Sequence, residues 1–303
     1  MAIGVSRVFH LNVNCSNLER SLAFYRDLLG LQTVLRTAPD GPQPGEAFGL
    51  DAAQWDAWIL ADSRGLEGVA IDLLEWQVPP PAGKPYETAN VPGFGRIAMT
   101  TTDIDGVYTR LVDAGFDCYG EPHDVDVEGI PSMKAFVCED PDGTLIELIS
   151  GDADRISVGI VNCLDLEQSV EFYEQVLGFK KLAHFGSGMR DGSGLRLGDT
   201  IDWEMAYLDD PRGELQFAVD LVKWHSPTSD GHAYESANHL GIYRMALLTE
   251  DIDAAYDELR ALGVECVTPP ANLTMGPGIP DLRALLFPDP NGAMLELIES
   301  PSA

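Results

Sequence analysis

The sequence repeats itself after 148 residues, and this repeat constrains the fold more than any other feature of the chain. The matching segments are Asn17-Leu18-Glu19 with Asp165-Leu166-Glu167, Phe24-Tyr25 with Phe172-Tyr173, Trp76 with Trp224, and, after one inserted residue, Asp140-Pro141-Asp142-Gly143 with Asp289-Pro290-Asn291-Gly292. Solenoid repeats run to only about 20–50 residues, so a repeat of this length indicates a duplicated domain. We therefore predict one domain over residues 1–150 and a second over residues 151–303. Residues shared by both copies are expected to serve folding, and residues found in one copy are candidates for chemistry.

Charge and cysteine content limit the partners and the compartment. The net charge is −30, from 49 acidic and 19 basic residues, and such a surface repels nucleic acid and anionic membranes. We therefore expect neither of them as a partner. The five cysteines form no CxxC pair, and the patterned N-terminal sequence has no room for a signal peptide, so we expect reduced thiols in the cytoplasm. Whether two chains associate as a homodimer is left open.

Each half of the repeat contains two copies of a strand–helix–strand–strand–strand unit. In the first copy, residues 5–14 alternate as a strand does, Asn17 is a predicted N-cap, and the helix that follows ends at Gly30. Further strands are predicted at 31–36, 55–61 and 68–76. The pattern begins again with a strand at 95–102 and a helix after the N-cap Asp103. The chain therefore holds four such units, and we predict an α+β fold.

Two long stretches rich in proline and glycine, 78–94 and 226–241, join the units within each half. The residues that recur in or beside both stretches are Trp76 and Trp224, Tyr86 and Tyr234, and Asn90 and Asn238. Because each of them occurs in both copies, we predict that they pack these linkers and do not carry chemistry.

The start and the end of the unit carry a recognisable signature. The start reads His10-x6-Asn17-Leu18-Glu19-x-Ser21-x2-Phe24-Tyr25-x4-Gly30, and the end reads Asp140-Pro141-Asp142-Gly143-x3-Glu147-Leu148. In these segments the chain resembles the vicinal oxygen chelate superfamily, which includes glyoxalase I, extradiol dioxygenases and bleomycin resistance proteins. The resemblance implies four βαβββ modules paired into two cup-shaped mixed-sheet barrels, and which modules pair is left open. Because the superfamily hosts many chemistries on this fold, the fold alone does not give the function.

In that family, the metal ligands come from the first and last strands of each unit, and two units share one site. The resemblance places these positions, unit by unit, at His10 and Asp72, Arg96 and Glu147, Val158 and Asp220, and Arg244 and Glu296. It implies a metal set of His10, Asp72 and Glu147, with Asp220 and Glu296 as the second-copy equivalents. The implied cofactor is one divalent ion of iron, manganese, zinc or nickel, or none.

Arginine stands at two positions where the family usually has a ligand histidine. A guanidinium has five N–H donors, no acceptor and a permanent positive charge, so Arg96 and Arg244 cannot coordinate a cation. Either pairing of the units leaves one arginine in each site, which excludes the two-histidine, one-carboxylate set of Fe(II) oxygenases. We favour a metal-free site in which the arginine forms an ion pair with the glutamate. A metal ion held by His10, Asp72 and a glutamate is the alternative.

Strand alternation indicates where the working site lies. One face of the first strand carries the polar residues His10, Asn12 and Asn14, whereas the corresponding face in the second copy carries Val158, Ile160 and Asn162. The polar copy is therefore the predicted site. The predicted substrate-binding residues are Asn12, Asn14, Asp72 and Arg244.

The predicted function is catalysis on a small oxygenated organic molecule. His10 would act as general base or metal ligand, Glu147 would shuttle protons or bind metal, and Arg96 would polarise a carbonyl or enolate oxygen. Isomerisation, epimerisation or lyase chemistry fits these three residues better than insertion of oxygen. The alternative is a protein that binds a small molecule such as a drug without catalysis, as resistance proteins of the family do. An extradiol dioxygenase is a third and weaker alternative.

Overall fold

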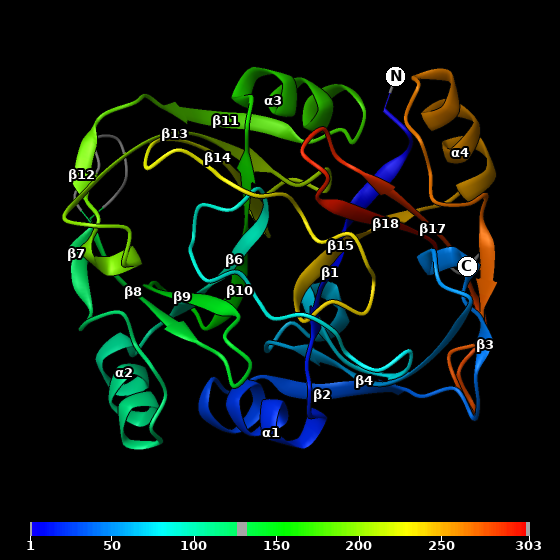
Figure 1. Ribbon diagram of the computed structural model, residues 1–303, viewed down its shortest axis with the longest axis horizontal. Coiled ribbons are helices and arrows are strands. Elements are labelled where there is room, and N and C mark those ends of the chain that lie inside the picture. The colour runs from blue at the N-terminus through cyan, green and yellow to red at the C-terminus, as the bar shows by residue number, and fades with distance from the viewer. Residues whose placement is uncertain (1, 126–131, 301–303) are drawn as a thin grey trace.

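The computed structural model describes residues 2–125 and 132–300, which form two curled mixed sheets of nine strands each. The first sheet, cup one, contains in spatial order β16 (Ala271–Leu273), β17 (Leu282–Pro288), β18 (Met294–Glu299), β15 (Gly241–Thr249), β1 (Val5–Asn14), β5 (Ala70–Val78), β4 (Ala52–Ala61) and β2 (Gln32–Thr37), with β3 (Gln43–Pro44) paired to β4. The second sheet, cup two, contains β11 (Lys180–Phe185), β13 (Thr200–Asp209), β14 (Ala218–Ser226), β10 (Arg155–Cys163), β6 (Gly93–Thr101), β9 (Leu145–Ser150), β8 (Met133–Glu139) and β7 (His123–Val125), with β12 (Met189–Asp191) paired to β13. Figure 1 shows cup two on the left and cup one on the right, with the helices around the outside.

The helices begin at capping side chains, as the sequence predicts. They are α1 (Leu18–Leu22) with its π-helical continuation η1 (Ala23–Leu28), α2 (Ile104–Asp113), α3 (Leu166–Gln175), α4 (Ile252–Ala261), and the short 3-10 helices η2 (Glu46–Phe48), η3 (Gly65–Glu67) and η4 (Ser193–Leu195). The Asn17 side chain accepts a hydrogen bond from Arg20 N, and Asp103 accepts one from Gly106 N, so each cap satisfies a backbone donor that has no partner inside the helix. The predicted caps are confirmed. None of the described helices is long and apolar enough to cross a membrane.

The pairing of the units answers the question that the sequence leaves open. Unit one (β1 to β5) meets unit four (β15 to β18) because β1 runs antiparallel to β15, with His10 opposite Ala246. Unit two (β6 to β9) meets unit three (β10 to β14) because β10 runs antiparallel to β6, with Ile160 opposite Arg96. Each cup therefore takes one unit from each half of the sequence repeat. The predicted α+β fold of four βαβββ units is confirmed.

Strand alternation separates the apolar core from the cups. The largest cluster of buried apolar side chains draws on the first strands of all four units, where it includes Leu11, Ile97, Val161 and Met245. The residues next to these in sequence point to the opposite side of each sheet, because successive side chains of a strand alternate between its faces. The lining of both cups therefore comes from the positions adjacent to the core residues.

A buried asparagine fastens the linker of the second half to the first strand of the chain. Asn14 donates from its amide nitrogen to the carbonyl oxygens of Ala237, at 2.8 Å, and His239, at 2.7 Å. Its amide oxygen accepts a hydrogen bond from the Trp76 indole at 3.0 Å. These three bonds use both N–H donors of the amide and one acceptor site. Asn14, expected from its strand face to bind substrate, is thus engaged by the linker.

The second copy repeats this arrangement with the other linker. Asn162 donates to the carbonyl oxygens of Ala89, at 2.8 Å, and Val91, at 2.7 Å, and accepts from the Trp224 indole at 2.8 Å. Tyr86 and Tyr234 stack between the two linkers with their ring centroids 4.1 Å apart. The prediction that these shared residues pack the linkers is confirmed. Each half of the chain holds the linker of the other.

The two asparagines should therefore matter equally to stability. Asn14→Leu and Asn162→Leu each leave one indole N–H and two linker carbonyl groups without partners, at a cost of about 1–3 kcal/mol per buried group. We expect each variant to lower the free energy of unfolding by about 3 kcal/mol or more, measured by urea denaturation with an unchanged m-value. The control Asn272→Ala, on an exposed position of β16, should change it by less than about 0.5 kcal/mol. A small effect at one asparagine and a large one at the other would contradict the symmetry.

Candidate functional site

Cup one brings four of the predicted site residues together around a guanidinium. Arg244 donates from Nε to Glu296 Oε2 at 2.7 Å and from Nη2 to Asp72 Oδ2 at 3.0 Å. His10 Nε2 lies 3.5 Å from the same Glu296 oxygen and 3.8 Å from the same Asp72 oxygen. All four residues are buried, with no more than 5% of the surface of each residue exposed. Arg244 is therefore the central cation of this cluster.

The charge of Arg244 decides the ionisation of its partner. Burial alone would raise the pKa of Glu296, but the positive charge of Arg244 and hydrogen bonds to the ionised carboxylate outweigh burial and lower this pKa to about 2. Asn12 donates to Asp72 Oδ2 at 3.2 Å, so the second carboxylate also has two donors. Cup one thus contains an ion-paired, hydrogen-bonded cluster.

A short helix closes cup one over this cluster. Phe48, in η2, points its ring between Trp55 and Trp76, with centroid distances of 5.8 and 5.3 Å and nearly perpendicular planes. The Arg244 guanidinium carbon lies 5.5 Å from the centre of the same ring. Phe48, Trp55 and Trp76 are all at most 5% exposed and belong to one buried cluster. The interior of cup one is therefore occupied by the protein's own side chains.

Cup two contains a similar cluster of charged side chains with fewer members. Arg96 donates from Nε to Glu147 Oε2 at 2.5 Å. Asp220 stands at the position of Asp72, and the apolar Val158 stands at the position of His10. Unlike Asp72, Asp220 accepts no hydrogen bond from the arginine of its cup. Among the described residues, neither Asp220 Oδ1 nor Arg96 Nη1 has a hydrogen-bond partner, although both atoms are buried.

The unpartnered carboxyl group in cup two has an unusual pKa. Burial and repulsion by Glu147 raise the pKa of Asp220 to about 7, although the charge of Arg96 opposes them. A carboxyl group with this pKa exists in both protonation states near neutral pH. Groups of this kind, placed beside a cation in a cup, are candidates for acid–base chemistry.

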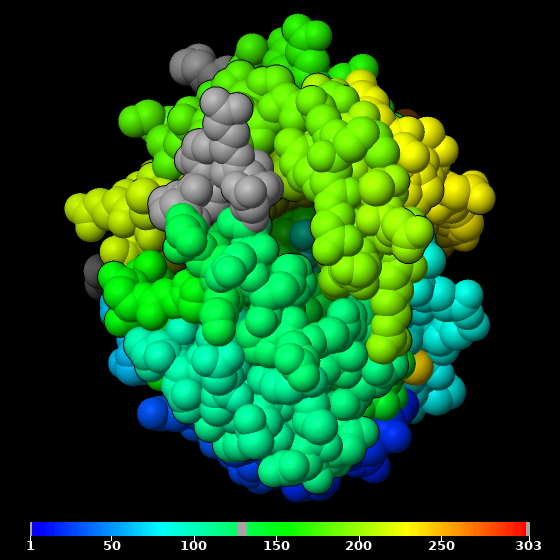
Figure 2. Space-filling view, turned by 90° about the vertical axis from the view of Figure 1, so that its left-hand side faces the viewer, coloured from blue at the N-terminus to red at the C-terminus, as the bar shows by residue number. Residues whose placement is uncertain are grey.

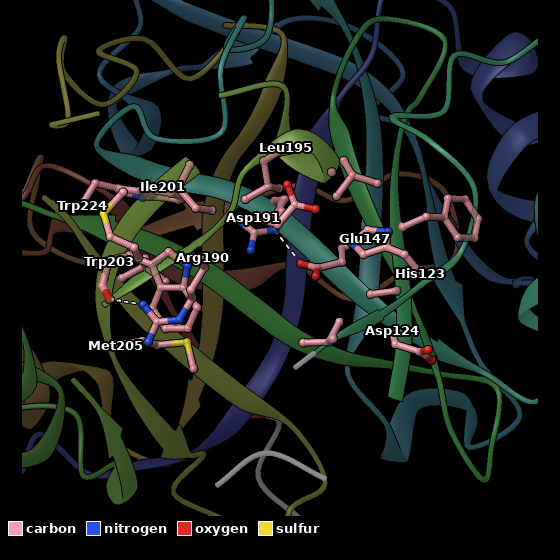
Figure 3. A pocket seen from close by; sticks show the side chains of 18 residues that line it. His123, Asp124, Glu147, Arg190, Asp191, Leu195, Ile201, Trp203, Met205 and Trp224 are labelled. Carbon is pink, nitrogen blue, oxygen red and sulfur yellow. Dashed lines mark hydrogen bonds and ion pairs between the residues drawn. The ribbon is translucent and has the colours of Figure 1, made fainter. Parts of the chain in front are cut away.

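A cavity of about 400 Å³ opens into cup two. Figure 2 shows this side of the molecule, with a hollow between the green segment around β8 and the yellow-green segment around β12. The lining residues that carry the argument below are Arg96, Glu147, Arg190, Leu195, Trp203 and Trp224. Figure 3 shows Arg190 and Trp203 on one side of the space and Glu147 and His123 on the other. Asp220 lies two residues before Val222, which lines the cavity, on the same face of β14.

The repeat explains why one cup is filled and the other is open. The helices η2 and η4 occupy equivalent places, each after a glycine and each ending in a left-handed residue, Gly49 and Arg196. In this register Leu195 corresponds to Phe48, so the aromatic ring that fills cup one is missing from cup two. Gly194 makes room for the His123 ring, because a Cβ there would come within 2.7 Å of it. The smaller residues of η4 therefore leave the space that forms the cavity.

The structure divides the predicted site residues between the two cups. Cup one contains His10, Asn12, Asn14, Asp72, Arg244 and Glu296. The other predicted residues, Arg96, Glu147 and Asp220, lie in cup two. Neither the predicted catalytic set of His10, Arg96 and Glu147 nor the predicted metal set of His10, Asp72 and Glu147 is assembled, because both sets combine units that do not pair.

Sequence reasoning did not identify Arg190 and Trp203, which line the cavity. Arg190 lies between Gly188 and Gly192 in a glycine-rich segment, and Trp203 aligns with Trp55, which is buried. The signal that could have pointed to this cup is the size of the residue three positions after each equivalent glycine, Phe48 after Gly45 and Leu195 after Gly192.

The chain is similar to glyoxalases in sequence and in fold. A sequence profile of the Glyoxalase/Bleomycin resistance protein/Dioxygenase superfamily matches residues 7–148 and 155–297. A lactoylglutathione lyase of Arabidopsis thaliana is 22% identical over 301 residues, 97% of this chain and 92% of the relative. A lactoylglutathione lyase of Salmonella typhimurium is 30% identical over 150 residues, 49% of this chain and 96% of the relative.

Solved structures show the same fold over the whole chain. Glyoxalase I from Zea mays gives a TM-score of 0.67 at 20% identity, covering 97% of this chain and 92% of that one. A putative dioxygenase from Bacillus subtilis gives a TM-score of 0.64 at 13% identity, covering 99% of this chain and 87% of that one. At such identities the likeness extends to the fold alone.

Members of the matched superfamily typically use a divalent metal ion, and the residues of neither cup fit one. In cup one, Arg244 points its N–H donors at the two carboxylates that would otherwise bind a cation. In cup two, Arg96 binds Glu147 in the same way, and Val158 offers no donor atom. Across residues 2–125 and 132–300, no group of three or more His, Cys, Asp or Glu side chains is arranged to hold a metal ion. A guanidinium thus takes the place of the ion in both cups.

Replacing that guanidinium by imidazole should create a metal site in cup one. Arg244→His would put a fourth ligand beside His10, Asp72 and Glu296, a set that suits Zn²⁺ or Ni²⁺. We expect about one bound ion per chain in this variant, measured by metal analysis after loading and dialysis.

Arg244→Met is the matched control for this experiment. It removes the same charge without adding a ligand, so it should bind the ion at least about tenfold more weakly than Arg244→His. It should also unfold more easily by about 3–5 kcal/mol, because two buried carboxylates lose their partner. One ion per chain in the unmodified protein, lost on His10→Ala, would contradict our interpretation of the cluster.

Proposed function

Because the chain belongs to the Glyoxalase/Bleomycin resistance protein/Dioxygenase superfamily, we propose that it is an enzyme that acts as a lyase or isomerase on a small oxygenated organic molecule in cup two. The observation that carries this proposal is the cavity of about 400 Å³, which is lined by the Arg96–Glu147 ion pair and lies beside the unpartnered carboxyl group of Asp220. A cavity of this size suits a small organic ligand, since such pockets measure about 300–1,000 Å³.

The residues of cup two can divide the chemistry of a carbonyl compound between them. The ionised Asp220 would take a proton from the carbon next to a carbonyl group, and the electron pair of that C–H bond would move toward the carbonyl oxygen. Arg96, whose Nη1 has no partner among the described residues, would stabilise the negative oxygen of the resulting enolate. Glu147 would hold Arg96 in place through their ion pair. Return of the proton to a neighbouring carbon gives an isomerase, and loss of a leaving group gives a lyase.

The names of the relatives support the choice of this reaction class. Those from Arabidopsis thaliana and Salmonella typhimurium are lactoylglutathione lyases. S-lactoylglutathione is therefore the first compound to test, and phenylpyruvate, which has a C–H group next to a carbonyl, is the second. Exchange of that carbon-bound proton with D₂O, followed by NMR, reports the proposed proton transfer directly.

Removing the proposed base should stop proton transfer without emptying the cup. We expect Asp220→Asn to lower the exchange rate by about 10²–10⁴-fold, because the amide cannot accept the proton. The dissociation constant of the compound should change little, since the amide has nearly the same shape. The control Asp152→Asn alters an exposed carboxyl group far along the chain and should leave the rate unchanged. An undiminished rate in Asp220→Asn would rule out this role.

The rate should also follow the ionisation of Asp220. Because the pKa of this group is raised to about 7, the ionised fraction increases as the pH rises through neutrality. We therefore expect kcat/KM to increase from about pH 6 to about pH 8 and then to level off. A rate that falls over this interval would show that the protonated carboxyl group is the active form.

A protein that binds without catalysis is the second candidate function. The arginines at the usual ligand positions favour it, since they remove the metal that many relatives' chemistry would need. The same NMR experiment separates the two functions. A compound that binds cup two and shows neither exchange nor product formation would support binding alone.

A further inference from the structure

The residues that line the cavity in cup two indicate a class of ligand narrower than small oxygenated molecules in general. This inference rests on the proposed function of the cavity. The wall from unit three carries Arg190, Trp203 and Trp224, and the wall from unit two carries Arg96 and Glu147. Figure 3 shows Arg190, Trp203 and Trp224 on one side of the space and Glu147 on the other. A ligand that fits both would combine an apolar part with a negative charge.

Arg190 supplies a cation that forms no salt bridge with a described carboxylate, although Asp202 attracts it at longer range. Its Nη1 donates to the carbonyl oxygens of Gly188 and Trp203, at 2.7 and 2.9 Å, and its Nη2 donates to the carbonyl oxygen of Gly186 at 2.9 Å. The guanidinium carbon lies 3.7 Å from the centre of the Trp203 ring. Within the described part of the chain Arg190 forms no salt bridge, and Asp202, which attracts it at longer range, accepts hydrogen bonds from Gly188 N and the Ser187 hydroxyl. Arg190 is thus fixed in position with a positive charge and N–H groups to spare.

This cation belongs to one copy of the repeat only. β12 pairs Arg190 with Ile201, and β3 pairs Gln43 with Ala53 at the equivalent place. The Gln43 side chain is neutral and is hydrogen-bonded to the backbone of Thr274 on the other wall of cup one. A residue that folding required would recur in both copies. The charge of Arg190 is therefore a candidate for function.

In cup one, Trp55 and Trp76 form an aromatic corner, and the group that fills this corner shows what kind of ligand it accepts. There the Phe48 ring lies between Trp55 and Trp76, approaching both edge-on, which is a favourable arrangement for aromatic rings. The guanidinium of Arg244 lies beyond this ring. Phe48 thus occupies cup one as a built-in aromatic ligand would.

Cup two keeps the aromatic corner but lacks the ring. Trp203 and Trp224 are cross-strand partners on β13 and β14, at the positions that Trp55 and Trp76 hold on β4 and β5. Both tryptophans line the cavity, and the residue in the place of Phe48 is Leu195. The space beside them can therefore receive a ring from outside the chain.

From these features we propose that cup two binds an aryl carboxylate, with its ring in the angle between Trp203 and Trp224 and its carboxylate on Arg190. Arginine pairs well with carboxylates because its N–H groups match their geometry and its charge is permanent. This placement fixes one end of the ligand on the unit-three wall. The other end then faces Arg96, the group assigned above to the reacting oxygen.

Three probes of similar size test the proposal on the unmodified protein. Phenylacetate has the ring and the charge, phenylacetamide has the ring alone, and cyclohexylacetate has the charge with a saturated ring. We expect phenylacetate to bind about tenfold more tightly than either of the others, measured by calorimetry and by quenching of tryptophan fluorescence. Equal affinity for phenylacetate and phenylacetamide would overturn the role of Arg190, and equal affinity for cyclohexylacetate would overturn the role of the aromatic corner.

Two variants locate the binding. Arg190→Gln should weaken phenylacetate about tenfold and leave phenylacetamide nearly unchanged, whereas Lys180→Met, which removes an exposed charge of the same unit, should change neither. Leu195→Phe copies the plug of cup one and should abolish binding of all three probes while raising or preserving the melting temperature. Binding that survives Leu195→Phe would place the ligand elsewhere and overturn the proposal. If Arg190→Gln does not fold, the probe comparison and Leu195→Phe still decide.

Failure of this inference can be told from failure of the proposed function. If the probes do not discriminate but Leu195→Phe stops proton exchange, cup two is the working site and only the ligand class is wrong. If the probes bind as expected and no compound undergoes exchange, cup two is a binding site for aryl carboxylates without the proposed chemistry. If Leu195→Phe affects neither probe binding nor exchange, both proposals fail.

Discussion

The antiparallel contact between first strands from opposite halves of the chain decides which side chains can meet. β1 lies beside β15, and β6 lies beside β10, so every cup joins a unit of one half to a unit of the other. His10 therefore meets Arg244 and never Arg96, although Arg96 is closer in sequence. The ion-pair clusters, the positions of the short helices η2 and η4, and the cavity all follow from this pairing.

On this shared scaffold a small number of substitutions separates a filled cup from an open one. Both cups hold an arginine paired to a glutamate on the last strand of the same unit, at 2.7 Å in cup one and 2.5 Å in cup two. Cup one adds His10, a second carboxylate on the arginine and the Phe48 ring, and it is closed. Cup two has Val158, a carboxyl group without a partner and Leu195, and it is open. The more polar cup is thus filled by its own side chains, although both ring nitrogens of His10, Asn12 Oδ1 and Arg244 Nη1 have no hydrogen-bond partner among the described residues.

Local features of the fold could be predicted from the sequence, because neighbouring residues determine them. The caps at Asn17 and Asp103, the packing residues of the linkers and the four βαβββ units are of this kind. The membership of each cup could not be predicted, since it depends on contacts between strands more than 200 residues apart, such as β1 and β15. The functional site was still harder to predict from the sequence. The number of polar residues on its face favoured the strand of His10 as the site, whereas the cavity depends on the size of one residue in η4, Leu195.

The linkers bind the two halves reciprocally, and this has a consequence for how such a chain can be divided. Asn14 holds carbonyl groups of the second linker, and Asn162 holds those of the first. A half-chain on its own would leave the edges of β1 and β6 without neighbours and its asparagine without carbonyl groups to bind. Such a fragment could complete its sheets only against a second fragment. The covalent link between the halves therefore replaces an association that two separate molecules would otherwise need.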